Sequence, residues 1–476
     1  MFRYESYDID PDSGVLTCRY SVDNYEFAER LTLTAGPAWE TPAAKVAARW
    51  VYLLAGVSYY KTAAPLVIDL GEHAVTDAER DFLQTFYLEG LGEFAYRNNL
   101  DLSGLKIEGP AVSPRGAVLP RGENPPRIPP ANGGAARPPV PPAGGPPAPQ
   151  SAGAGAADGS SLKALVPFGG GIDSIVSVEM IREKADVALF VVSRPGALFD
   201  AIEKPAAVTG LPVVRAGREI DPQLLRSAEL GFLNGHVPVT GIISAIAVLA
   251  AVLNGRDAVV MSNEWSASEP TLERDGKPVN HQWSKSGEFE GAFRAILAAD
   301  PAGLPEYFSA LRDRTELWIA DRFAQHTQYH STFRSCNRAF HIDTARRLDH
   351  WCGECDKCCF IDLILAPFLP ADALGAIFAA DGGGAEPLTR ADLAPKFRTL
   401  LGSGTKPFEC VGEVNECRAA VVLAATRPDR AECALLQELA AEINGRTDAP
   451  TPVEIEAMRK RVGANFIPAV YAGIGQ

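Results

Sequence analysis

The sequence predicts an α/β protein in which a doubly wound parallel sheet is accompanied by an α+β N-terminal domain and a helical C-terminal region. Two observations lead to this fold class. From residue 161 onward, short apolar strands alternate with helices, as in a parallel sheet with helical crossovers. A glycine turn joins the first of these strands to its helix, where such sheets bind ligands. With 476 residues, 46% hydrophobic and 22% charged, the chain has the composition of roughly two to four globular domains.

Residues 1–108 predict the α+β domain. The first strands are joined by a turn at Pro11-Asp12-Ser13-Gly14. Thr41 before Pro42 marks a helix start, and Thr76 with Glu79 forms a capping box. The expected elements are short strands within residues 4–33, a helix from 41 to about 60, a strand at 65–70 and a helix from 76 to about 98.

Residues 109–160 differ from the rest of the chain in composition. They hold 14 Pro and 10 Gly among 52 residues and no aromatic residue. Such a segment buries too little apolar surface to offset the entropy of ordering it. We predict a disordered, partly polyproline linker, with a ligand for a proline-recognising module as the alternative.

Residues 161–365 predict the parallel sheet, and residues 366–476 a helical region. The expected strands are 163–168, 187–193, 211–214 and 257–261, and the expected helices are 174–183 and 240–253. The 17 uncharged residues from 237 to 253 fall short of the ~20 apolar residues of a membrane span. A buried helix of the α/β domain is therefore expected there.

The charge balance limits the partners of the protein. With 45 Lys+Arg against 59 Asp+Glu, the net charge is −14, which argues against general binding of nucleic acid or of an anionic membrane. The first residues lack the basic end and apolar core of a signal peptide. Nine cysteines are too few for a disulfide scaffold. We expect a cytoplasmic protein.

The glycine turn reads GGGIDS, from Gly169 to Ser174. Glycines between a strand and a helix let the backbone approach a ligand, and the positive helix end favours an anion. No Lys-Ser/Thr follows as in a Walker A loop, and Ser174 stands where a dinucleotide fingerprint has its third glycine. The turn predicts phosphate or pyrophosphate binding; a glycine turn without a ligand is the alternative.

Four cysteines cluster with the spacing C-x15-C-x2-C-x2-C. Such a set can close a tetrahedral thiolate site, in which zinc with four protein ligands is structural. An iron–sulfur cluster and a catalytic thiol network are the alternatives. The predicted ligands are Cys336, Cys352, Cys355 and Cys358. Cys359 and Cys410 are expected to be small buried hydrophobes, although a cysteine can also act as a racemase acid or base.

Both motifs resemble parts of known families. The glycine turn is similar to the SGGxDS loop of the PP-loop ATP pyrophosphatases, which release pyrophosphate on adenylating a substrate. Gly169 replaces the usual first serine of that loop, so one hydroxyl contact to phosphate is missing. The cysteine spacing is similar to the zinc site of 7-cyano-7-deazaguanine synthase, itself a PP-loop enzyme. This resemblance implies an adenine nucleotide alpha hydrolase-like fold, with Ser193 near the adenosine.

Several polar blocks carry a more specific resemblance. SNEWSASE at 262–269 follows the fourth predicted strand, and VNHQWSKS follows at 279–286. Together with GVSYYK at 56–61, HVPVT at 236–240 and FECVG at 408–412, they resemble the UDP-N-acetylmuramoyl-L-alanyl-L-glutamate epimerase family of bacterial peptidoglycan synthesis. The resemblance covers most of the chain except the linker.

The family resemblance implies an isomerase that uses ATP and Mg²⁺ to invert the terminal L-glutamate of the UDP-linked dipeptide to D-glutamate. Converting the carboxylate to an acyl-adenylate removes the charge that makes the α-proton hard to abstract. A base then takes that proton, its return on the other face gives the D-epimer, and hydrolysis leaves AMP and pyrophosphate. A functional link to the ligase that adds L-glutamate is also implied.

The implied residue roles fall into three groups, and each side chain has an ordinary structural role as its alternative. Catalysis is assigned to His281, Lys285, Glu264 and Asp173, the last also near Mg²⁺. ATP binding is assigned to Gly169, Gly170, Gly171, Asp173, Ser174 and Ser193. Substrate binding is assigned to Asn263, Asn280, Tyr59, Tyr60 and Lys61.

Two other functions compete with epimerisation. Another adenylating PP-loop enzyme would form an amide, nitrile or thioamide and would need an ammonia or sulfur donor. A non-catalytic zinc-bearing nucleotide sensor would bind ATP without turning it over, and Gly169 in place of serine is compatible with it.

Overall fold

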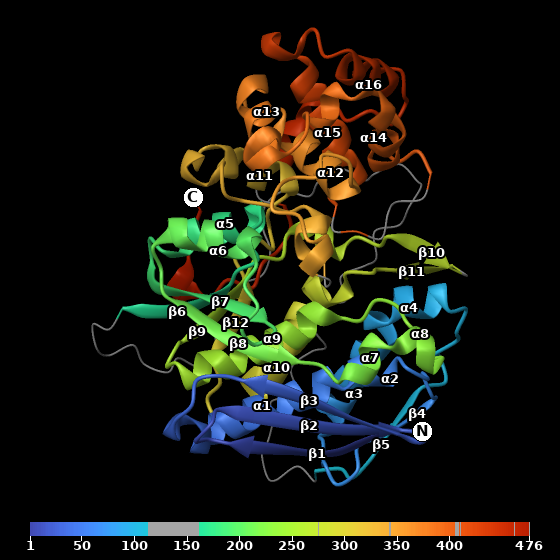
Figure 1. The fold of residues 1–476 in the computed structure, drawn as a ribbon, viewed down its shortest axis with the longest axis vertical. Coiled ribbons are helices and arrows are strands. Elements are labelled where there is room, and N and C mark those ends of the chain that lie inside the picture. The colour runs from blue at the N-terminus through green and yellow to red at the C-terminus, as the bar shows by residue number, and fades with distance from the viewer. Residues whose placement is uncertain are drawn as a thin grey trace.

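The computed structural model describes residues 1–112, 161–274, 276–341, 344–404, 409, 411–460 and 462–475. All but the first four residues of the predicted linker lie outside these ranges. A ten-stranded sheet with the order β12-β9-β6-β7-β8-β3-β2-β1-β4-β5 runs through the molecule (Figure 1). Its strands are β1 (Phe2–Asp10), β2 (Val15–Val22), β3 (Tyr25–Thr32), β4 (Val67–Asp69), β5 (Lys106–Glu108), β6 (Leu162–Pro167), β7 (Ala185–Ser193), β8 (Val213–Glu219), β9 (Ala258–Met261) and β12 (Glu306–Ser309). The strands β10 (Leu272–Arg274) and β11 (Lys277–Val279) form a separate hairpin.

The helices cover both faces of the parallel half and make up the C-terminal region. Those of residues 1–112 are α1 (Pro42–Ala55), α2 (Val57–Tyr60), α3 (Asp77–Gly90) and α4 (Gly92–Arg97). Those that follow are α5 (Ile172–Ile181), α6 (Asp200–Thr209), α7 (Pro222–Leu225), α8 (Ser227–Leu230), α9 (Val239–Leu253), α10 (Gly287–Ala299), α11 (Glu316–Ala324) and α12 (Asp356–Leu365). The C-terminal ones are α13 (Ala371–Ala379), α14 (Ala394–Leu400), α15 (Val414–Ala425), α16 (Ala434–Asn444) and α17 (Pro452–Met458).

The parallel half of the sheet confirms the doubly wound prediction. Its strands pair in parallel and lie in the order third, second, first, fourth, fifth, counted along the chain from β6. The strand order reverses between β6 and β9, which is the position where sheets of this kind bind ligands. Alternate residues of β6 face two cores: Val166 belongs to the core that includes Ile175 of α5, and Leu165 to the core that includes Ile246 of α9.

The sheet continues across the predicted domain boundary. Strand β3 pairs antiparallel with β8, from Arg30 opposite Glu219 to Thr32 opposite Gly217. Helix α1 packs against α9, and both belong to one hydrophobic core with the inner face of β1–β3. The segment 1–108 and the parallel half therefore share a sheet and a core.

A buried ion pair lies where the two halves of the sheet meet. The fully buried Glu29 carboxylate accepts hydrogen bonds from Arg218 Nε (2.7 Å) and from the Tyr59 hydroxyl (2.9 Å). Arg218 Nη2 also donates to Ser58 Oγ at 3.3 Å. Removing one member of such a pair leaves the other charge buried without compensation, at a cost of about 3–5 kcal/mol.

Local sequence signals predicted several of these elements. Strands β1–β3, the Thr41 cap of α1 and the Thr76 capping box of α3 are all present. The single helix expected over residues 41–60 is interrupted at Gly56, because the Tyr4 hydroxyl donates to Leu53 O, the carbonyl that would continue the helix. The strand expected at 211–214 instead runs as β8 to Glu219, because its polar end pairs with β3.

The C-terminal region is helical, as predicted, and forms the end of the molecule away from β1–β3 (Figure 1). The last described residues return to the parallel half, where Gly475 lies against Met180 of α5 and its carbonyl accepts from Arg314. Helix α9 is buried, as expected from its apolar sequence. Among the described residues, no helix has the length and apolar content needed to cross a bilayer.

Candidate active site

Three chain segments meet at the carboxyl edge of the parallel sheet, on either side of the strand-order reversal. The glycine turn follows β6, Asn263 and Glu264 follow β9, and residues 310–316 follow β12. Parallel strands bring their carboxyl ends to one edge, which is why segments far apart in sequence converge here. The sequence had identified the first two segments.

The glycine turn is shaped by steric limits on its backbone. Gly170 has φ +77°, and a Cβ there would lie 2.1 Å from the Ala201 carbonyl oxygen, so only glycine fits. Gly171 is the N-cap of α5 and its helix has no side-chain cap, while Ser174 Oγ donates to Gly171 O at 3.0 Å. The first N–H groups of α5 are therefore available to an anion.

Two positions around the turn bear on the missing serine. A Cβ at Gly169 would meet nothing within 4 Å, so the glycine there is not required sterically. A Cβ at Gly171 would lie 2.8 Å from Ser335 Oγ, so the hydroxyl of Ser335 sits against the turn. Ser193, at the end of the neighbouring strand β7, is half-buried and donates to Arg194 O at 3.2 Å.

An acidic cluster, formed by Asp173, Glu264, Glu316 and Glu416, lies beside the turn. Burial raises the pKa of Glu316 well above its usual value, and the charges of Asp173 and Glu264 raise it further. Glu264, Glu316 and Glu416 are only 6%, 3% and 1% exposed. Lys357 opposes this effect with its positive charge. The sequence identified Asp173 and Glu264 but not the other three residues.

Glu416 brings the C-terminal region into the acidic cluster. It lies on α15, and its Oε2 accepts from Leu317 N at 3.1 Å, at the start of α11. Its Oε1 is buried and has no hydrogen-bond partner. Burial, followed by the charge of Glu413, raises the pKa of Glu416 to about 8. No local motif marks this residue, because only the packing of α15 against α11 places it here.

A basic cluster, formed by Lys61, His236, His281 and Lys285, lies on the side of the site that faces residues 1–112. Burial lowers the pKa of His236 to about 4, and the charges of His281, Lys285 and Lys61 lower it further. The ring centroids of His236 and His281 are 6.2 Å apart. Lys61 Nζ donates to Asn234 Oδ1 at 2.8 Å. The two predicted catalytic bases thus lie together with one predicted substrate ligand and with His236, which had no predicted role.

The Arg312 side chain joins the two clusters. Its guanidinium is 3% exposed and pairs with Glu290 at 2.8 Å. It also donates to the backbone oxygens of Glu264 (2.9 Å) and Lys285 (2.5 Å). The backbones that carry an acidic and a basic site residue are therefore held by one cation.

The remaining predicted substrate ligands make structural contacts. Tyr59 donates to Glu29, as described above, and Tyr60 is buried with its ring edge-on to Phe2 and Tyr87. Asn280 Nδ2 donates to Ala267 O at 2.8 Å, and the Asn263 N–H donates to Ser309 Oγ at 2.8 Å. Their roles toward the substrate remain predictions.

The four predicted metal ligands come together as a cysteine knuckle. Their Sγ atoms all lie within 4.8 Å of one another, with Cys352–Cys358 at 3.6 Å and Cys355–Cys358 at 3.5 Å. A tetrahedral zinc–thiolate site places its sulfurs roughly 3.8 Å apart, whereas a disulfide needs about 2.05 Å. The donor set therefore fits a structural zinc ion.

The knuckle lies directly beside the glycine turn. Ser335, which contacts Gly171, precedes Cys336, and Lys357 lies between the ligands Cys355 and Cys358. A folded knuckle thus holds one hydroxyl and one cation at the edge of the candidate site. Cys359 is buried, which raises its pKa to about 12, in keeping with the prediction of a buried hydrophobe. Cys410 is outside the described residues.

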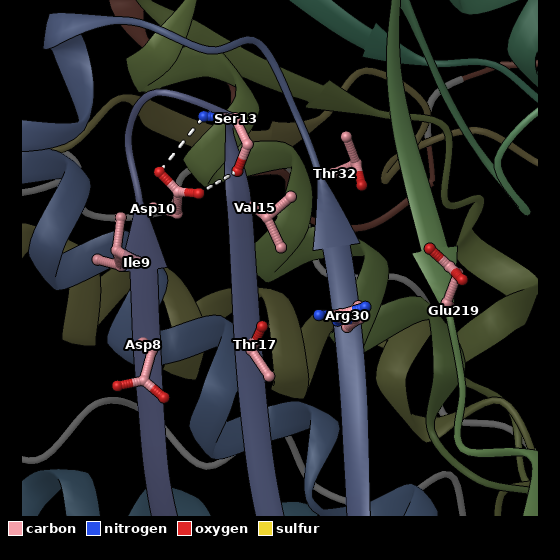
Figure 2. A pocket seen from close by; sticks show the side chains of 9 residues that line it. All are labelled: Asp8, Ile9, Asp10, Ser13, Val15, Thr17, Arg30, Thr32 and Glu219. Carbon is pink, nitrogen blue, oxygen red and sulfur yellow. Dashed lines mark hydrogen bonds between the residues drawn. The ribbon is translucent and has the colours of Figure 1, made fainter.

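A cleft of about 420 Å³ lies between residues 269–272 and the start of α15. Its lining includes Thr271, which bonds to His281, and Glu413, which raises the pKa of Glu416. A second pocket, of about 280 Å³, lies on the outer face of β1–β3 and β8 (Figure 2). Neither pocket is lined by a predicted site residue, but the lining of the cleft contacts one, through the Thr271–His281 hydrogen bond.

The fold and the site define an α/β protein with a candidate anion-binding turn at the strand-order reversal and a cysteine knuckle beside it. A family model of the MurL N-terminal domain matches residues 1–134 and 141–310. A family model of the MurL C-terminal domain matches residues 332–453. The chain therefore belongs to the MurL family. The N-terminal model spans the predicted boundary at residue 108, in agreement with the continuous sheet.

Curated relatives are similar over nearly the whole chain. A UDP-N-acetyl-alpha-D-muramoyl-L-alanyl-L-glutamate epimerase from Xanthomonas oryzae pv. oryzae is 37% identical over 473 residues, 98% of this chain and 95% of the relative. Proteins of the same name from Salinispora tropica and a Micromonospora species are each 38% identical over 89% of this chain, and over 84% and 86% of their own lengths. No solved structure matches the chain significantly.

Proposed function

We propose that the protein is an ATP-dependent isomerase that inverts the terminal L-glutamate of UDP-N-acetylmuramoyl-L-alanyl-L-glutamate. The family and the names of the relatives identify the reaction. The observation that carries its assignment to this site is the meeting of the glycine turn, the acidic cluster and the basic cluster at one sheet edge.

The glycine turn would act as a PP-loop that binds ATP. The turn from Gly169 to Ser174, with the N-terminus of α5, would hold the phosphates, and Ser193 would lie near the adenosine. Asp173 would bind Mg²⁺, a cation that prefers carboxylate oxygen. The buried acidic cluster fits a cation, since a divalent ion would offset both the burial and the repulsion that raise the pKa of Glu316. Bound Mg²⁺ would offset phosphate charge during adenylation.

The basic cluster would act on the activated glutamate. An acyl-adenylate carries no carboxylate charge, so its carbonyl can accept the electrons left when the α-proton departs. His281 and Lys285 would transfer protons or hold the adenylate, and Lys61 would meet the negative groups of the nucleotide-linked substrate. Glu264, whose backbone oxygen accepts from Arg312, would position substrate or metal.

The cysteine knuckle would have a structural role, without contacting the substrate. Four thiolate ligands leave no open coordination position for a substrate, so zinc there would be structural. Its contribution would be to hold Ser335 and Lys357 against the turn. The Ser335 hydroxyl would then stand in for the one that Gly169 lacks. In this role the protein acts in the cytoplasm, directly after the ligase that adds L-glutamate.

The test uses the UDP-muramoyl-L-Ala-L-Glu dipeptide with ATP and Mg²⁺ in heavy water. Deuterium at the terminal α-carbon and AMP are followed together, and the configuration of glutamate is read after hydrolysis. We expect label and D-glutamate only with ATP, alongside AMP. AMP without label would move the protein to the amide-, nitrile- or thioamide-forming enzymes, and ATP binding without AMP would indicate a nucleotide sensor.

A further inference from the structure

A buried ion pair, Glu290 with Arg312, contacts the two loops that carry Glu264 and Lys285. Glu290 lies on α10 and is 1% exposed, and Arg312 lies in the loop after β12 and is 3% exposed. Arg312 Nε donates to Glu290 Oε2 at 2.8 Å, and Glu290 Oε1 accepts from the Ser309 N–H at 2.7 Å. Because both carboxylate oxygens are bonded, the guanidinium is held in one orientation.

The other two guanidinium nitrogens connect the two loops. Nη1 donates to Glu264 O at 2.9 Å, and Nη2 donates to Lys285 O at 2.5 Å. Ser268 Oγ, which is 3.5 Å from Nη1, accepts from the Gly287 N–H at 3.1 Å and so joins the same loops a second time. A guanidinium is planar and presents its donors in a fixed fork, so it sets the separation of the two carbonyl groups.

The two loops depend on Arg312 to different degrees. The backbone on either side of Glu264 has anchors that do not involve Arg312: Asn263 N to Ser309 Oγ (2.8 Å) and Trp265 N to Arg314 O (2.9 Å). Substitution of Arg312 leaves these bonds in place but removes the one to Lys285 O. The position of Lys285 should therefore change more than that of Glu264.

We propose that Arg312 is a positioning residue that couples adenylation of the substrate to its epimerisation. This assignment rests on the proposed function, in which Glu264 positions substrate or metal and Lys285 transfers protons or holds the adenylate. Arg312 is buried and bonded within the protein at Nε, Nη1 and Nη2, so it acts through the two loops and not on the substrate.

The consequence of losing this coupling follows from the chemistry of the adenylate. With the loops at a fixed separation, the acyl-adenylate formed beside the acidic cluster meets the basic cluster at once. With Lys285 displaced, proton transfer slows, and water cleaves the bond between the acyl carbon and the AMP oxygen before inversion. The products are then AMP and the unchanged L-glutamyl carboxylate.

The test is Arg312→Lys, which keeps the charge beside Glu290 but replaces the fork by a single nitrogen. Initial rates of AMP release and of D-glutamate formation are measured in the same tube with the UDP-muramoyl-L-Ala-L-Glu dipeptide, ATP and Mg²⁺. We expect D-glutamate formation to fall about a hundredfold, as it does when a reacting group is misplaced by about 1 Å, and AMP release to fall less than about tenfold. The AMP released per D-glutamate should therefore rise at least about tenfold.

Two further variants accompany it. Arg294→Lys is the matched control, because Arg294 also pairs with a carboxylate, Glu306 (3.4 Å), and donates to a backbone oxygen, Tyr307 O, outside both loops. Its AMP released per D-glutamate should stay parental. If Arg312→Lys fails to fold, Arg312→Met combined with Glu290→Gln removes both buried charges, a change that proteins often tolerate, and the same rise is expected.

The ratio of AMP to D-glutamate separates positioning from stability, since a misfolded fraction lowers both rates by the same factor. A rise of this ratio at Arg312, with none at Arg294, supports the proposal. A proportionate fall of both rates, parental rates, or an equal rise in Arg294→Lys would overturn it. A parent that forms no D-glutamate would instead refute the proposed function itself.

Discussion

Two buried groups of charge in this molecule are built in opposite ways. At the β3–β8 junction, Glu29 is fully buried, but Arg218 and Tyr59 both donate to it. In the acidic cluster, burial and then the neighbouring carboxylates raise the pKa of Glu316, and Glu416 Oε1 has no hydrogen-bond partner. The first group is compensated within the chain, whereas the second contains mostly charge of one sign.

The difference separates structural burial of charge from functional burial. A compensated pair can persist because it joins two parts of the fold, whereas like charges in a buried site cost folding free energy. Such a cost is retained where a ligand of opposite charge compensates it, so perturbed groups collect at functional sites. The cysteine knuckle is a third kind of group, in which one metal cation would compensate four thiolates.

The knuckle provides the largest expected effect. Cys355→Ser should abolish zinc binding and unfold the region around α12, because structural zinc contributes on the order of 10 kcal/mol to folding. The measurement is metal content, expected at about one zinc per chain in the parent, together with thermal unfolding. A brown, iron-containing parent would contradict the zinc assignment, and Cys433→Ser, in a cysteine outside the knuckle, is the control.

The β3–β8 junction provides the next effect. Glu29→Ala should lower the free energy of unfolding by about 3–5 kcal/mol, because Arg218 would remain buried without its partner. Denaturant unfolding measures the loss, and kcat/KM per folded molecule should stay near the parental value. If activity fell while stability did not, the junction would belong to the active site, and the distinction between the two charge groups would fail.

The acidic cluster should respond in the opposite direction. Glu316→Gln replaces a carboxyl group whose ionisation is opposed by burial and by its acidic neighbours. Stability should therefore rise or stay level, while AMP formation falls about a hundredfold, a loss of about 2.7 kcal/mol in transition-state stabilisation. The two quantities are measured by denaturant unfolding and by AMP release at saturating Mg²⁺. A variant that lost stability and kept its activity would show that the cluster is structural.

Local sequence signals were sufficient for the elements that depend on neighbouring residues. Each such signal occupies a short stretch of sequence, and the structure confirms the elements concerned: the Thr76 capping box, the apolar helix α9 and the glycine turn. Gly170 carries the clearest local signal, since its φ of +77° and the nearby Ala201 carbonyl admit no side chain.

Long-range packing decided what the sequence could not predict. The polar end of β8 becomes a strand only because β3 pairs with it. Glu416 enters the acidic cluster because α15 packs against α11, and Lys357 because the knuckle folds beside the glycine turn. Glu416 lies in no motif, and the cysteine spacing around Lys357 predicts a metal site but not a contact with the acidic cluster. The sequence therefore predicted half of the acidic cluster, through Asp173 and Glu264.

Glu416 tests the same difference between compensated and uncompensated buried charge, through a smaller effect on stability that depends on pH. Its pKa is raised to about 8 in the fold, so its contribution to stability is complete below the unfolded pKa of about 4.3 and is lost as the pH rises through 8. Glu416→Gln cannot ionise and keeps an acceptor for Leu317 N. From pH 6 to pH 8 the variant should gain about 2 kcal/mol over the parent, measured by urea unfolding. A difference that does not change with pH would contradict this.

The smallest effect is expected where charges meet in solvent. Arg398 pairs with Glu438 and with Glu442 (2.6 Å), and both glutamates are well exposed. Because water screens such pairs and the side chains lose entropy on pairing, Arg398→Ala should cost under about 1 kcal/mol, and 1 M salt should remove most of that cost. Urea unfolding at two salt concentrations measures it. The comparison with Glu29→Ala is direct, because each substitution removes one member of a carboxylate–guanidinium group. A cost at Arg398 as large as that at Glu29 would mean that burial is not what distinguishes the charges of this molecule.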